Sequence, residues 1–309
     1  MTQQQRDALN EMMSKSPLDV GGNAIEQRAH FDEMLTARPL ADDVTTTPGE
    51  LGGVPVLTIA AGETNSSAVV LWFHGGWYVM GSPLTSAGIS SDIARRIGVR
   101  VVSVDYRLAP EHPYPAALQD AHAAYRGLLD SGVDPRSIAI VGESAGGGLA
   151  VALLASLAGT GLMQPACAVL LSPWTDLTLS GETMASKIGI DPAFIPEKVS
   201  VRAVEYVGSA IAADPLISPI FADLHGLSPI LIQGGSNEIL LDDSIRLARR
   251  AATDDVSVTL DVTPGVPHLF QAFASMLDEG DAALTRAARF LDHHLSRALV
   301  PNRLHAVPT

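Results

Sequence analysis

The chain has 309 residues with a formal net charge of −14, and 47% of its residues are hydrophobic. Acidic side chains outnumber basic ones, 34 against 20, and no basic stripe is present, so we expect no nucleic-acid partner. A lone cysteine, Cys167, excludes an intrachain disulfide, and no apolar run resembles a signal peptide or a membrane span, which predicts a cytoplasmic protein.

The first 40 residues are predicted to form helices, over 3–13 and 23–36, that dock on the rest of the chain because they carry too many apolar side chains for a free tail. Two strands follow, over 43–47 and 54–60, and we expect them to begin the sheet as an antiparallel pair. Beyond them strands alternate with helices, which predicts a parallel sheet within one domain.

A glycine loop follows the next strand, a wholly apolar run over 69–73 that fits burial on both faces of a sheet. The loop reads His74-Gly75-Gly76-Trp77. A reaction that builds an oxyanion needs hydrogen-bond donors already aimed at it, and glycine lets the backbone approach closely. We therefore predict oxyanion donors among the main-chain N–H groups of Gly75, Gly76 and Trp77, and we expect His74 to brace the loop.

The most informative stretch comes after a predicted strand at 100–104, a helix at 116–129 and a strand at 137–141. It reads Gly142-Glu143-Ser144-Ala145-Gly146 and precedes a helix-forming run, so it has the G-x-S-x-G pattern of a nucleophile elbow. The flanking glycines leave room for a sharp strand-to-helix turn. We predict that Ser144 is a nucleophile and that the Ala145 N–H is a further oxyanion donor; an ordinary glycine-rich turn with an incidental serine is the alternative.

The segment after the next predicted strand, at 166–171, departs from the alternation of strands and helices. Residues 174–215 separate this strand from the following one, predicted at 229–233. The segment contains helix candidates at 184–187 and 196–207.

An acid and a histidine follow the last two predicted strands. In hydrolases built on such an elbow the catalytic groups run Ser, acid, His along the chain. His268 follows the final strand, at 257–262, and the candidate acids Glu238, Asp242 and Asp243 follow the strand before it. Helices are predicted at 242–253 and 281–298. Parallel strands would bring all of these groups to one edge of the sheet.

These motifs together resemble the hormone-sensitive-lipase-like family of bacterial carboxylesterases, family IV of the lipolytic enzymes, over roughly residues 40–298. The stretches that carry the resemblance are 74–76, 105–117, 142–147 and His268. The resemblance implies an α/β-hydrolase fold with a mostly parallel central sheet, helices on both of its faces and a helical cap.

The resemblance also implies a division of the chain. Residues 1–40 would supply N-terminal cap helices, and residues 41–299 the catalytic domain. A cap insertion at about 175–215 would complete the cap, and 300–309 would be a C-terminal tail.

Three departures from the family pattern matter for the site. Trp77 stands where the family usually has a third glycine; its main-chain donor survives, but its indole could narrow the site. Glu143 replaces the common Asp or Thr, and we interpret it as a supporting or neutral position. Glu238 aligns with the family's catalytic aspartate, which makes it the predicted acid, with Asp242 and Asp243 as its competitors.

The resemblance predicts a serine carboxylesterase with the triad Ser144, Glu238 and His268, no cofactor and no metal. We expect a small-molecule ester as substrate, with acyl chains of roughly two to six carbons because Trp77 takes up pocket volume. A homodimer is possible, and the sequence does not decide whether it forms. Two alternatives remain, a lactone or small acetyl-ester hydrolase of the same mechanism and a non-catalytic ligand receptor on the same fold. His268 argues against the receptor.

Overall fold

A computed structural model describes residues 3–64, 66–158 and 160–299, without the side chains of 296–299. One sheet of eight strands crosses this part of the molecule in the order β1-β2-β4-β3-β5-β6-β7-β8. The strands are β1 (Val44–Leu51), β2 (Val54–Ala61), β3 (Val69–Phe73), β4 (Arg100–Val104), β5 (Ile138–Glu143), β6 (Cys167–Leu171), β7 (Ile230–Gly235) and β8 (Val258–Thr263).

The strand directions bring the predicted site residues to one edge. β1 pairs antiparallel with β2, and β2 with β4, so the predicted antiparallel start is confirmed. From β4 through β8 every pairing is parallel. β3, β5 and β6 are buried at every position, as expected for apolar strands covered on both faces. The loops after β3, β5, β7 and β8 therefore meet at the carboxyl edge of the sheet.

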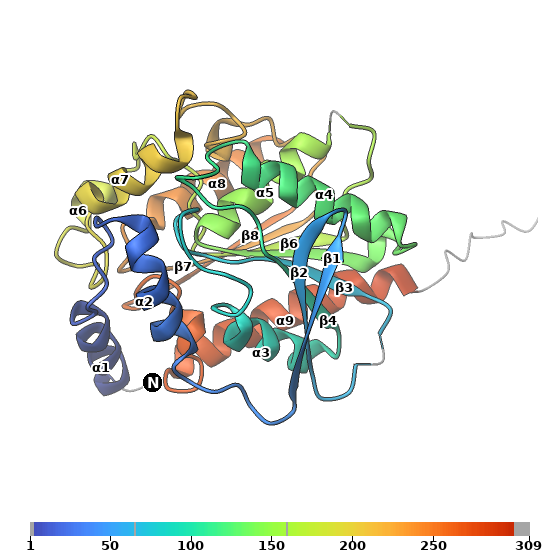
Figure 1. Cartoon of the computed structure of the whole chain (residues 1–309), viewed down its shortest axis with the longest axis horizontal. Coiled ribbons are helices and arrows are strands. Elements are labelled where there is room, and N and C mark those ends of the chain that lie inside the picture. Colours follow the sequence, from blue (N-terminus) through green and yellow to red (C-terminus); the bar gives the residue numbers. More distant parts are fainter. Residues whose placement is uncertain (1–2, 65, 159, 300–309) are drawn as a thin grey trace, which may run out of the picture.

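Helices cover both faces of the sheet, as predicted (Figure 1). α3 (Ala87–Ile97) and α9 (Asp278–Leu299) pack on one face. α4 (Ala116–Asp130), α5 (Ala145–Leu157) and α8 (Leu241–Thr253) pack on the other. The sequence pattern does not predict α3, although a parallel β3–β4 pair requires a crossover of this kind.

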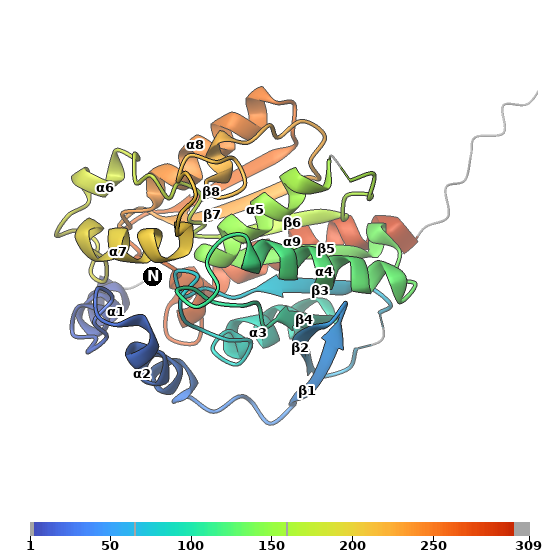
Figure 2. The ribbon, with the colours of Figure 1, turned by 45° about the horizontal axis from the view of Figure 1, so that its top comes forward.

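The remaining helices, α1 (Gln3–Ser14), α2 (Ala24–Thr36), α6 (Thr183–Ser186) and α7 (Pro196–Val207), gather at one end of the molecule (Figures 1 and 2). The predicted docking of the N-terminal residues is seen in their contacts. Arg28 of α2 donates to the Val79 carbonyl at 2.8 Å. Arg202 of α7 donates to the Gly22 carbonyl at 2.6 Å, so the N-terminal segment also contacts the segment between β6 and β7.

Short 3₁₀ helices complete the described elements: η1 (Pro135–Ser137), η2 (Pro219–Phe221) and η3 (Phe270–Phe273). None of the described helices combines the length and apolar character that crossing a membrane requires. The predicted tail at 300–309 lies outside the described residues.

Candidate active site

Ser144 lies on a strained turn between β5 and α5. Its φ of 53° is in the left-handed region that L-residues seldom occupy, which is the backbone strain expected of a nucleophile elbow. The turn is held on both sides, since the Ser144 N–H donates to Leu171 O at 2.9 Å and the Ser144 carbonyl accepts from Trp174 N at 2.9 Å. The serine itself is only 4% exposed.

The glycines of the elbow are required by close packing of the backbone. A Cβ at Gly142 would lie 2.2 Å from the Gly146 carbonyl oxygen, and one at Gly146 would lie 2.1 Å from that of Phe73. The first turn of α5 is therefore pressed against the end of β3. This places the elbow beside the loop that carries Gly75, whose own Cβ would be 3.4 Å from the Ser144 Cβ.

The loop after β3 presents unused amide donors. Gly76, Trp77 and Tyr78 all have positive φ, of 115°, 55° and 64°. Within the described part of the chain, the amides of Gly76, Trp77 and Ala145 donate to no protein group. Free amides next to a nucleophile are what an oxyanion hole requires.

Gly75 departs from the predicted role as an oxyanion donor. Its N–H donates to Glu143 Oε1 at 3.3 Å, so this amide is engaged within the protein. The sequence could not show this, because the acceptor lies on a different strand.

His74 braces the same loop, as expected. Its Nδ1 donates to the Gly75 carbonyl at 2.7 Å, and its ring stacks on Tyr106 with centroids 4.1 Å apart. The Tyr106 hydroxyl donates to the His74 carbonyl at 2.8 Å. Complete burial lowers the pKa of the imidazole to about 4, so His74 is neutral near pH 7.

The predicted acid and base are joined directly. His268 Nδ1 donates to Glu238 Oε2 at 2.6 Å, and both side chains are buried. The other carboxylate oxygen, Oε1, accepts from Gly235 N at 2.5 Å and from the Ser172 hydroxyl at 3.0 Å. Ser172, which the sequence analysis missed, also accepts from Leu269 N at 3.2 Å and so contacts the loops of both the acid and the base. No hydrogen bond joins Ser144 to His268 among the described side chains.

The two other candidate acids, Asp242 and Asp243, are bonded to groups other than His268. Asp242 accepts from Glu182 N at 2.9 Å and pairs with Arg246 at 3.0 Å. Asp243 accepts from the amides of Thr175 and Asp176 at 2.7 and 2.9 Å. Burial raises the pKa of Asp243 to about 7, with the neighbouring carboxylate of Asp176 adding to the shift. Among the described residues, the acid bonded to His268 is Glu238.

A row of aromatic rings leads from α2 to the base. Phe31 lies edge-on to Trp77 with centroids 5.8 Å apart, and Trp77 lies edge-on to Phe194 at 5.1 Å. Phe194 in turn lies 5.0 Å from the His268 ring. Asp191 fixes this segment, because its carboxylate accepts from Phe194 N at 3.0 Å and from Ile239 N at 2.9 Å, one residue after Glu238.

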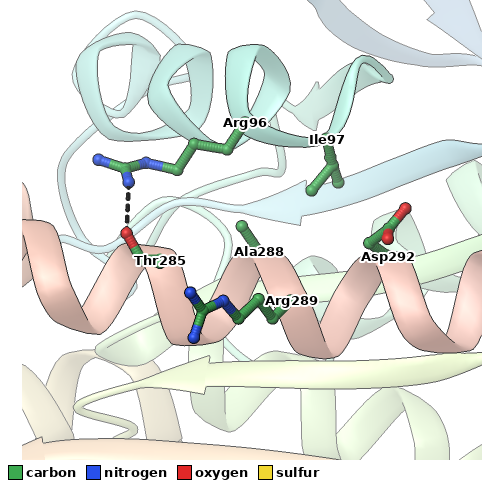
Figure 3. Close-up of a pocket in the computed structure, with 6 residues that line it drawn as sticks. All are labelled: Arg96, Ile97, Thr285, Ala288, Arg289 and Asp292. Carbon is green, nitrogen blue, oxygen red and sulfur yellow. Dashed lines mark hydrogen bonds between the residues drawn. The ribbon is translucent and has the colours of Figure 1, made fainter.

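Two surface hollows lie away from these groups. One, of about 290 Å³, lies between α3 and α9, where Arg96 donates to the Thr285 hydroxyl at 2.7 Å (Figure 3). It is at the C-terminal end of α3, roughly 16 Å along the helix axis from the end that faces the elbow. The other, of about 300 Å³, lies beside the edge strand β8.

One group of side chains has the spacing of a metal site. Ligand atoms of Asp223, His225 and Asp254 lie within 4.8 Å of one another. The protein already uses these atoms: His225 Nδ1 donates to Asp223 at 2.6 Å, and Asp254 accepts from Leu224 N at 3.0 Å. Asp254 follows the C-terminus of α8, whereas Glu238 precedes its N-terminus, so the group is remote from the triad.

Comparison with known proteins places the chain among ester hydrolases. A family model described as alpha/beta hydrolase fold matches residues 70–272. The chain is 36% identical to an esterase of Acinetobacter venetianus over 276 residues, which cover 89% of this chain and 90% of that one. It is also 36% identical to an acetyl-hydrolase of Streptomyces hygroscopicus over 252 residues, which cover 79% and 84%.

Solved structures show the same similarity to esterases. The crystal structure of an esterase from the bacterial hormone-sensitive lipase family superposes with a TM-score of 0.91 at 40% identity. The superposition covers 96% of this chain and 99% of that one. These matches confirm the predicted α/β-hydrolase fold.

Proposed function

Because the chain belongs to the hormone-sensitive-lipase-like carboxylesterases of the α/β-hydrolase family, and is therefore a carboxylic ester hydrolase, we propose that it works as a serine esterase on short-chain acyl esters. One observation carries the proposal: His268 is bonded to the buried Glu238 at the sheet edge where Ser144 occupies a strained elbow.

The geometry supports a two-step reaction. Ser144 Oγ attacks the acyl carbon while His268 Nε2 takes the hydroxyl proton, and His268 then returns that proton to the leaving alkoxide. The resulting acyl-enzyme is cleaved by a water molecule that His268 deprotonates, which releases the carboxylic acid and restores the serine. Glu238 holds the imidazole through Nδ1 and stabilises its positive charge.

The oxyanion of each tetrahedral intermediate would be bound by main-chain amides. Gly76, Trp77 and Ala145 have free N–H groups on the two segments that flank Ser144. The Ala145 amide is also the first of α5, where the helix dipole favours negative charge.

The acyl group would be limited in length by the aromatic row. Trp77 is only 6% exposed and lies between Phe31 and Phe194, and Phe194 lies against the base. Two large rings close to the triad leave little room for a long chain. The acetyl-hydrolase among the relatives is consistent with a small acyl group. We assign the cap role to residues 1–40 and about 175–215, since these segments supply Phe31 and Phe194.

The alternatives differ in how well the site fits them. A receptor without chemistry would have no need for a buried acid bonded to a histidine at a strained serine, so the site favours an enzyme. A lactone or small acetyl ester would react by the same steps and stays within the proposal. The choice among these substrates depends on the shape of the pocket.

The test is the activity of Ser144→Ala on a panel of p-nitrophenyl esters and lactones. We expect turnover to fall on the order of 10⁶-fold, as in other serine-hydrolase triads, with little change in stability. A fluorophosphonate probe should label Ser144 in the unmodified protein and nothing in the variant. Labelling of a different serine would contradict the assignment of the nucleophile.

A further inference from the structure

Glu143, the last residue of β5, is a buried carboxylate directly before the nucleophile. It is 5% exposed, and its Oε1 accepts from three donors. These are Gly75 N at 3.3 Å, Trp72 Nε1 at 3.5 Å and the Ser86 hydroxyl. The donors belong to β3, to the loop after β3 and to the residue before α3, so one oxygen joins three segments.

Such a carboxyl group is costly to bury, because a charged or polar group removed from water destabilises the protein unless it is fully bonded. The Ser86 hydroxyl supplies one of these bonds. Ser86 is the N-cap residue of α3, where a serine hydroxyl ordinarily accepts from the first turn, yet its side chain makes no capping bond and donates to Glu143 instead.

The bond to Gly75 fixes the direction of the backbone at the start of the oxyanion loop. The peptide N–H of Gly75 points to Glu143, and the next two amides, of Gly76 and Trp77, are the free ones. Trp77 and Tyr78 both have positive φ, which L-residues seldom adopt, so the direction of the amides in this loop depends on support from the surrounding structure.

We propose that Glu143 is a positioning residue for ester hydrolysis, which holds the Gly75 amide through Oε1 and thereby aims the Gly76 and Trp77 amides at the oxyanion. This inference rests on the serine mechanism proposed above. Glu143 acts through the loop and does not touch the substrate.

A purely electrostatic role is the competing explanation. His268 is near enough to lower the pKa of Glu143, while burial raises that pKa by a larger effect. If the negative charge itself mattered, by stabilising the imidazolium, a neutral side chain of the same shape would fail. If the acceptor oxygen matters, that side chain should work, because a glutamine Oε1 can accept from the same donors.

The experiment compares Glu143→Gln with Glu143→Met, which has a similar size but no acceptor oxygen. Ile138→Ala, a truncation of a buried side chain at the other end of the same strand, where it pairs with Val69, is the control for lost stability. Each protein is measured for kcat and KM on p-nitrophenyl acetate, and for the affinity of an alkyl trifluoromethyl ketone, which forms a tetrahedral adduct with the serine.

We expect Glu143→Met to lower kcat by about 10- to 100-fold with little change in KM, because a misplaced donor is lost only in the transition state. The affinity for the ketone should fall by a similar factor, and the pH profile of kcat/KM should keep its shape. Glu143→Gln should stay within about threefold of the unmodified protein.

Three outcomes would overturn the proposal: unchanged ketone affinity in a folded Glu143→Met protein, a Gln variant as impaired as the Met variant, or a loss matched by Ile138→Ala. Ser86→Ala gives a second route if Glu143→Met does not fold, since it removes one donor to Oε1 and should cause a smaller loss of the same kind. Failure of the serine mechanism is recognised separately, because the fluorophosphonate probe would then not label Ser144 in the unmodified protein.

Discussion

The Ser172 hydroxyl donates to Glu238 Oε1 at 3.0 Å, on the same carboxylate whose other oxygen accepts from His268. Ser172 Oγ also accepts from the amide of Leu269, the residue after the base. The serine therefore sets the distance between the acid loop and the histidine loop. Its own φ of 47° shows that the backbone is held in an unfavourable conformation to bring the side chain there.

Ser172→Ala should lower kcat by about fivefold, since a net hydrogen bond contributes about 1 kcal/mol and the triad loses one of its supports. KM should change little, and the effect is measured by steady-state kinetics on p-nitrophenyl acetate. Ser228→Ala is the matched control, because Ser228 is also buried and donates to one carbonyl, that of Pro165, away from the site. Equal losses of kcat in the two variants would mean that Ser172 only stabilises the fold.

Glu238→Gln should lower kcat by on the order of 10⁴, because an amide at this position no longer stabilises the imidazolium and can donate to Nδ1, which favours the wrong tautomer. Asp242→Asn should cost less than about tenfold, since Asp242 is bonded to Arg246 and to the Glu182 amide. Both variants are compared by kcat at constant folded fraction. A larger loss for Asp242→Asn would transfer the role of the acid to Asp242.

Much of this fold can be predicted from local patterns. The apolar runs of β3 and β6 predict buried strands, and every residue in these strands is buried in the structure. The glycines around Ser144 predict the elbow, and the packing there leaves no room for a Cβ at Gly142 or Gly146. α3 is not predicted from such patterns, because its buried face includes the polar residues Ser90 and Ser91, which weaken the apolar periodicity.

The supports of the site are harder to predict, because their partners are distant in the sequence. Gly75 donates to a residue 68 positions away, and Ser172 to one 66 positions away. A glycine loop by itself predicts free amides at Gly75, Gly76 and Trp77 alike. Only the packing of β3 beside β5 brings the Glu143 carboxylate to the first of them.

His74 should make the protein sensitive to mild acid. Its pKa is lowered from 6.5 to about 4 in the folded state, so the unfolded chain takes up the proton first. The stability that a neutral His74 contributes is complete above pH 6.5 and is lost as the pH falls toward 4, by up to about 1.4 kcal/mol per pH unit.

This pH dependence is measured by urea unfolding at pH 7 and pH 4.5. His74→Gln should lose less stability over that interval than the unmodified protein, although it will be less stable at pH 7. His112→Gln, at an exposed histidine, serves as the control and should follow the unmodified protein. Parallel losses of stability in all three proteins would exclude His74 as the source.

Trp77 should set the acyl length that the enzyme accepts. Trp77→Gly would remove the ring beside Phe194 and place glycine at a φ of 55°, a conformation that glycine adopts freely, while the main-chain donor stays. Each added methylene that fits gains about 0.8 kcal/mol, whereas one forced against a packed wall costs about 1–3 kcal/mol. The unmodified protein should therefore prefer roughly two to six carbons, and Trp77→Gly should prefer longer chains.

The measurement is kcat/KM across a series of p-nitrophenyl esters for both proteins and for Phe31→Leu. Phe31 contacts the indole from α2, and Phe194 contacts it from the segment that reaches the base, so Phe31→Leu loosens the packing around Trp77 without removing its ring. If Trp77 forms the wall of the pocket, only Trp77→Gly should move the optimum toward longer chains. The same shift in Phe31→Leu would assign the effect to a loosened cap, and an unchanged profile in Trp77→Gly would show that the indole only packs against the cap.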